Sequence, residues 1–115
     1  MKLIQPRRAA AGAIAADTRR PATAVVHDTP DARLVVFRMS AGQSVPPHRS
    51  VSSVLLCVVS GRGVVSGASE ERTVEEGDVV AYEPNELHGM RATDDDFVLL
   101  ATITPRPRDR AGGTS

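Results

Sequence analysis

The chain has 115 residues, of which 41% are hydrophobic and 3% aromatic, and its 14 basic and 14 acidic residues leave no net charge at pH 7. This length suffices for one hydrophobic core and is too short for two ordinary domains. Nucleic acids and anionic membranes attract proteins through a basic field, so we do not expect either one as the main partner.

The sequence shows no sign of export or of a membrane anchor. Cys57 is the single cysteine and lies in an apolar run, so we interpret it as a small buried residue and not as half of a disulfide. No apolar stretch approaches the ~20 residues of a membrane-spanning helix. Arg7 and Arg8 precede an alanine-rich stretch that looks like an export signal, but Asp17 ends it early. We therefore expect a cytoplasmic protein.

Both ends of the chain are basic, and we predict that both are flexible. Residues 1–23 form an amino-terminal arm, in which composition allows a helix over 8–16 and residues 2–5 offer an edge strand to the body or to a neighbouring subunit. An isolated helix of that length is marginal in water. Residues 105–115 are predicted to be a disordered tail because they combine Pro, Arg and Gly with few apolar residues.

Residues 24–104 are expected to form one all-β domain without helices. Short runs rich in Val, Leu and Thr alternate with Gly, Pro, Asp and Asn turns at the spacing typical of a sandwich or barrel. Pro46 and Pro47 lack backbone donors, so their segment is placed at an edge or a bend. The predicted strands are 24–27, 33–39, 51–59, 63–66, 72–74, 79–82, 87–92 and 97–104.

The run from Val54 to Val59 is apolar at every position, which indicates that both faces of its strand are covered. One face can look into a barrel. The other face needs a second sheet, the amino-terminal arm or a partner subunit, and we expect a homodimer.

The same region resembles a small single-domain cupin, whose fold is a jelly-roll barrel. The first cupin motif, G-x5-H-x-H-x3,4-E-x6-G, falls on Gly42, His48, Ser50, Val54 and Gly61. The second motif, G-x5-P-x-G-x2-H-x3-N, falls on Gly77, Glu83, Asn85, His88 and Ala92, with Pro84 shifted by one position. Asn85 is a sensible substitute for the motif glycine because asparagine tolerates a positive φ.

The resemblance implies that three histidines and a glutamate face the barrel interior and hold a divalent ion such as Fe, Zn, Ni or Mn. This chain keeps His48 and His88, while Ser50 and Val54 replace the other two ligands. Two imidazoles fall short of the three protein ligands typical of a catalytic zinc site. The metal-ligand set is therefore predicted to be incomplete.

Other donors could fill the gap only from elsewhere in the chain. Glu83 and Glu86 lie in a turn, where we expect a solvated rim. His27 lies in a different strand, with a direction that the sequence leaves open. Cys57 has the opposite parity from the motif positions and is expected to point away from the site.

Alternation along the strands predicts a ligand pocket even without a metal, because residues 48, 50 and 54 are expected to share one strand face. Arg49 has the opposite parity and is expected at the surface, and Tyr82 is interpreted as an edge-packing aromatic. A mostly apolar cavity with two imidazoles and one hydroxyl is typical of a small-molecule site. Its predicted lining is His48, Ser50, Val54, Leu56, His88 and Met90.

Two functions follow from this pocket. The preferred hypothesis is a small-molecule-binding protein with an incomplete metal site, because two ligand positions are lost. The alternative is a metal-dependent enzyme of the dioxygenase, isomerase, epimerase or cyclase type, in which His48 and His88 are metal ligands or acid–base groups. A purely structural module is the weakest interpretation, since it gives the two histidines no use.

Overall fold

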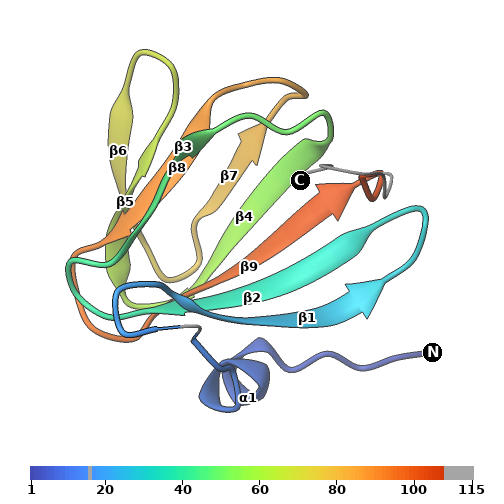
Figure 1. Cartoon of the computed structure of the whole chain (residues 1–115), viewed down its shortest axis with the longest axis horizontal. Coiled ribbons are helices and arrows are strands. Elements are labelled where there is room, and N and C mark those ends of the chain that lie inside the picture. The colour runs from blue at the N-terminus through green and yellow to red at the C-terminus, as the bar shows by residue number, and fades with distance from the viewer. Residues whose placement is uncertain (16, 108–115) are drawn as a thin grey trace.

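The computed structural model describes residues 1–15 and 17–107 and confirms the predicted all-β fold. Two antiparallel sheets face each other: sheet A has the order β1-β2-β9-β4-β7, and sheet B has the order β3-β8-β5-β6 (Figure 1). No helix in this part of the chain is long and apolar enough to span a bilayer. The elements are α1 (Pro6–Ala11), β1 (Ala22–Asp28), β2 (Arg33–Met39), β3 (Ser44–His48), β4 (Ser53–Ser60), β5 (Arg62–Ser66), β6 (Glu71–Glu75), β7 (Val79–Tyr82), β8 (His88–Ala92) and β9 (Phe97–Thr104).

The proline segment forms a strand of its own at an edge, as its missing backbone donors require. Strand β3 contains Pro46 and Pro47 and is the first strand of sheet B. Its pairing with β8 shifts register between Val45 and His48, so the ladder is interrupted where the prolines stand. The strand predicted over 51–59 accordingly begins later, at Ser53.

The helix allowed over 8–16 begins earlier and is shorter in the structure, while the flexibility of the arm stays a prediction. A shorter helix, α1, begins with a proline in its first turn and ends before Gly12, and residues 2–5 form no strand. Residue 16 lies outside the described residues. The proline fits the first turn because the amide hydrogen that it lacks has no partner within a helix there.

Helix α1 is held by contacts that sequence propensity does not contain. It lies on the outer face of sheet A, below β1 and β2 in Figure 1, where Ala10 packs in one buried cluster with Val36 and Val98. Arg38 Nη1 donates to the carbonyl of Ala10 at 2.6 Å, at the end of the helix. These tertiary contacts stabilise a helix that would be marginal alone.

The start of the predicted tail is also held. The backbone N–H of Arg106 donates to the carbonyl of Pro30 at 3.2 Å, and Arg106 Nη1 lies 3.4 Å from Asp28 Oδ1. Arg106 thereby lies against the β1–β2 turn. The remainder of the predicted tail, 108–115, lies outside the described residues.

The main core fills the space between the sheets. Phe97, Leu99, Met39 and Val58 are among its fully buried side chains. Within one chain the outer face of β4 is covered only in part, because Leu55 is 39% exposed there, and its coverage by a partner subunit stays a prediction. Helix α1 covers the outer face of β4 only near Val59, which packs against the cluster that contains Ala10.

Candidate ligand-binding site

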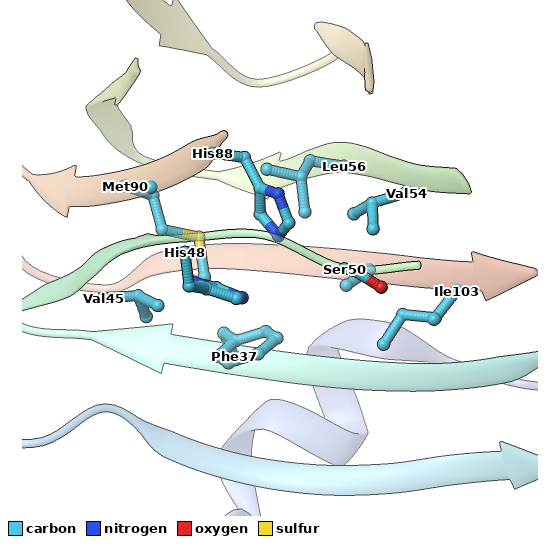
Figure 2. Close-up of a pocket in the computed structure, with 11 residues that line it drawn as sticks. Phe37, Val45, His48, Ser50, Val54, Leu56, His88, Met90 and Ile103 are labelled. Atoms are coloured by element: carbon cyan, nitrogen blue, oxygen red, sulfur yellow. The ribbon is translucent and has the colours of Figure 1, made fainter. Parts of the chain in front are cut away.

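A cavity of about 80 Å³ lies between the two sheets, and both sheets contribute to its walls (Figure 2). One water needs about 10–15 Å³ by this kind of measure, so the cavity has room for a molecule of roughly five to eight water-sized positions. Its lining is Phe37, Val45, His48, Ser50, Val54, Leu56, His88, Gly89, Met90, Ala101 and Ile103.

All six residues predicted to line a pocket lie around this cavity: His48, Ser50, Val54, Leu56, His88 and Met90. The structure brings these residues together in a different way from the one predicted from strand alternation. His48 ends β3 in sheet B and Val54 lies on β4 in sheet A, so positions 48, 50 and 54 do not share one strand. The chain bends over residues 49–52 and supplies both walls. Ligand binding by these residues stays a prediction.

The two histidines are neighbours because their strands are in register. His48 on β3 is the direct pairing partner of His88 on β8, and directly paired residues project to the same face of a sheet. Their ring centroids lie 4.2 Å apart with a tilt of 58°. His48 is exposed at the surface, whereas only 7% of His88 is exposed. The pair therefore extends from the opening of the cavity inward.

Each imidazole is held in one orientation by a backbone carbonyl. His48 Nδ1 lies 3.0 Å from the carbonyl oxygen of Pro46, and His88 Nδ1 lies 3.0 Å from that of Glu86. A carbonyl can only accept, so each Nδ1 must carry the hydrogen and donate it. In the neutral rings, each Nε2 then keeps a lone pair. Figure 2 shows both rings reaching into the space above Phe37.

The β7–β8 turn is hydrogen-bonded to the segment that connects β3 to β4 at the rim of the cavity. Asn85 has a φ of 67°, which confirms the prediction that it replaces a glycine at a left-handed position. Its N–H donates to the carbonyl of Ser50 at 2.7 Å, and its own carbonyl accepts from Arg49 Nη1 at 2.7 Å. Arg49 is exposed, as its parity predicts. This turn thus fixes the bend that carries Ser50.

The acidic residues of this turn do not reach into the cavity. Glu83 and Glu86 are both exposed, which confirms the predicted solvated rim. The carboxylate of Glu86 accepts from the backbone N–H of Glu83 at 2.9 Å, so it caps its own turn. Only its backbone carbonyl serves the site, by orienting His88.

Burial sets the electrostatics of the inner histidine. Desolvation lowers the pKa of His88, and the neighbouring His48 lowers it further, while the carbonyl and carboxylate of Glu86 oppose this effect. The His88 ring is therefore neutral at pH 7. Tyr82 packs beside it, with ring centroids 5.1 Å apart.

Tyr82 supports the site from behind and does not enter the cavity. It is only 6% exposed, and its hydroxyl donates to the carbonyl of Ser66 at 2.9 Å. Burial raises the pKa of this phenol, and the charge of Glu86 raises it as well. This placement agrees with the interpretation of Tyr82 as a packing aromatic. Its hydroxyl hydrogen is donated to Ser66, so it is not available to a ligand in the cavity.

The four-ligand metal set implied by the resemblance does not fit the residues present. His27 lies on β1, the edge strand of sheet A, where it pairs with Leu34 of β2, and it does not line the cavity. Cys57 does not line it either, as its parity predicts. Within residues 1–15 and 17–107, no three His, Cys, Asp or Glu side chains are placed to share one ion. The cavity offers two imidazole nitrogens and the Ser50 hydroxyl.

Sequence reasoning missed part of the lining, mainly on sheet A. Ile103 and Ala101 of β9 pair with Val54 and Leu56 of β4 and so face the same cavity. Phe37 on β2 closes the wall below. Alternation along 97–104 was the available signal, but the choice of face depends on the β4–β9 register, which the sequence does not contain.

The model of the Cupin domain family matches residues 35–103, more than half of the chain. The chain belongs to the cupin family. Its barrel is similar to KdgF from a Halomonas species (25% identity, TM-score 0.72, covering 75% of this chain and 81% of the other). It is also similar to an RmlC-like cupin from Desulfovibrio desulfuricans (28% identity, TM-score 0.72, covering 81% and 90%).

The cupin fold extends to more distant structures. A Thermus thermophilus protein, TT1209, shares 20% identity and a TM-score of 0.82, over 93% of this chain and 100% of the other, and so supports the fold alone. A search of the curated proteins finds no match. The framework glycines of this cupin, Gly42, Gly61 and Gly77, all have positive φ. An alanine Cβ at Gly61 would lie 2.8 Å from the carbonyl oxygen of Asp96.

Proposed function

We propose that this cupin binds a small molecule in its histidine-lined cavity and does so without a complete metal site. The observation that carries the proposal is the histidine pair, with ring centroids 4.2 Å apart and both Nδ1 atoms bonded to backbone carbonyls, in a mostly apolar cavity of about 80 Å³ that also holds Ser50. Apolar walls with a few convergent polar groups are the usual form of a small-molecule site. The protein would act as a carrier, a sensor or an accessory protein.

A metal-dependent enzyme of the dioxygenase, isomerase, epimerase or cyclase type is the second candidate. One observation favours it: each Nδ1 donates to a backbone carbonyl, which is how metal-binding histidines are commonly oriented. Fe, Zn, Ni or Mn would then be held by His48 and His88, with further ligands from a bound molecule. The binding function ranks first because Ser50 and Val54 occupy the other ligand positions.

The three methionines of the chain provide the test. Met90 lines the cavity, Met39 is fully buried in the core, and Met1 is exposed at the terminus. Protein labelled with ¹³C at the methionine methyls is screened by NMR against a fragment library in buffer containing EDTA. We expect fragments that shift the Met90 signal and leave those of Met39 and Met1 in place. A library in which no fragment moves Met90 selectively contradicts the proposal.

Metal content separates the two candidates. Protein purified without a histidine tag is analysed for Fe, Zn, Ni and Mn, beside a His48→Ala variant and a His27→Ala control, since His27 lies outside the cavity. We expect no near-stoichiometric metal in any of the three proteins. A stoichiometric metal that disappears only in His48→Ala supports the enzyme instead.

A further inference from the structure

We propose that the ligand of this cavity is an uncharged molecule about the size of one ring, which presents an O–H or N–H donor to the histidine pair. The inference rests on the proposed binding function and specifies its ligand class. Its three elements are the absence of charge in the lining, the orientation of both imidazoles and the size of the cavity.

The lining excludes a charged ligand. None of the eleven lining residues is Asp, Glu, Lys or Arg. The nearby charged side chains, Arg49 and Glu86, are exposed and already bonded to the β7–β8 turn. An ion that enters a cavity with no countercharge loses its hydration without compensation. Carboxylates and ammonium groups are therefore disfavoured.

The histidine pair calls for a donor. Because both Nδ1 atoms donate to carbonyl oxygens, the neutral form of either ring can only accept at Nε2. A purely apolar ligand would leave the Nε2 lone pair of the buried His88 without a hydrogen bond, which is costly. A hydroxyl or N–H group satisfies it.

The remaining walls fix the body of the ligand. Phe37, Leu56, Met90 and Ile103 surround the cavity with apolar surface (Figure 2). Its volume of about 80 Å³ is about half that of a closed cavity of ~150 Å³ that admits benzene, and because this cavity opens beside the exposed His48, one small ring can enter it from that side. Phenol is the simplest probe with these properties, and toluene has the same shape without the donor.

The test measures the dissociation constants of phenol, toluene, benzoate and benzylammonium from the Met90 methyl shift, with the full chain in EDTA. We expect phenol to bind at least as tightly as toluene, although toluene is the more apolar molecule, and both charged probes to bind more weakly. The variants His48→Phe and His88→Phe remove one acceptor each. In either one, the preference for phenol over toluene should fall about two- to thirteenfold, the range for one net hydrogen bond.

His27→Phe is the matched control, because His27 lies outside the cavity, and should keep the wild-type preference. Since His48 is exposed, its variant remains informative if the buried His88 variant does not fold. Benzoate as the tightest probe, toluene tighter than phenol in the wild type, or an unchanged preference in His48→Phe overturns the donor inference while the binding function stands. If none of the four probes moves Met90 and the fragment screen is also empty, both are refuted.

Discussion

Restoring the two lost ligand positions should give this cupin a metal site. Ser50 and Val54 line the same cavity as His48 and His88 and replace the histidine and the glutamate of the family motif. The double variant Ser50→His, Val54→Glu would place three imidazoles and one carboxylate around that cavity, a set suited to Zn or Ni. We expect zinc to stabilise this variant and to leave the wild type almost unchanged.

The magnitude follows from the burial of Val54, which is 5% exposed. Its buried side chain contributes about 1.5–3 kcal/mol, and the new carboxyl group must also be desolvated, so the metal-free variant should lose about 3–5 kcal/mol. A chain of 115 residues has a typical free energy of unfolding of about 6–17 kcal/mol and should stay folded. Zinc at 100 times its dissociation constant returns about 2.7 kcal/mol, or roughly 10 °C in melting temperature.

The assay is thermal unfolding followed by circular dichroism, with EDTA and then with added zinc. The matched control is Ser50→Asn, Val54→Gln, which introduces buried polar groups but neither the third imidazole nor the carboxylate. A zinc shift below about 2 °C in the glutamate variant, or an equal shift in the glutamine control, would refute the view that positions 50 and 54 face one metal-sized point.

Three further predictions concern stability and assembly. Burial holds the pKa of His88 below 6.5 in the folded state, so on acidification the unfolded chain binds a proton at His88 more readily than the folded chain does. The urea concentration at the unfolding midpoint should therefore fall from pH 7 towards pH 5, and it should fall less steeply in His88→Gln. In Gly63→Ala, the new Cβ would lie 2.4 Å from Phe97 Cε2; we expect a loss of about 1–3 kcal/mol in urea unfolding, and an unchanged midpoint would contradict this packing. Leu55 and Val79 are 39% and 63% exposed on the paired strands β4 and β7 of sheet A, and we expect this apolar patch to be a dimer interface. Light scattering at micromolar concentration should give the mass of a homodimer for the wild type and of a monomer for Leu55→Glu. A monomeric wild type would speak against this interface.

The strands were readable from the sequence because each carries its own signal. Phe97 to Thr104 is apolar and β-branched between polar turns, and it forms β9 with the predicted bounds. Asn85 was predicted to tolerate a positive φ from residue chemistry alone, and it adopts one. Local rules of this kind require no knowledge of neighbouring strands.

The site was only partly readable because it depends on pairing between distant strands. The family motif pointed to His48 and His88, but their 4.2 Å approach comes from the β3–β8 register. Phe37 and Ile103 enter the lining through the β2–β9–β4 pairing, which sequence periodicity does not specify. The bounds of helix α1 were predicted too far along the chain for the same reason, since its stability comes from contacts with sheet A.

The most direct test of the central claim is the dissociation constant of the best fragment for protein in EDTA, compared with protein incubated with Mn, Fe, Zn or Ni. Binding through His48, His88 and apolar walls predicts the same constant within about twofold in all samples, because the lining itself supplies the contacts. Binding that appears only after one metal is added would contradict the account and identify a metal-dependent site.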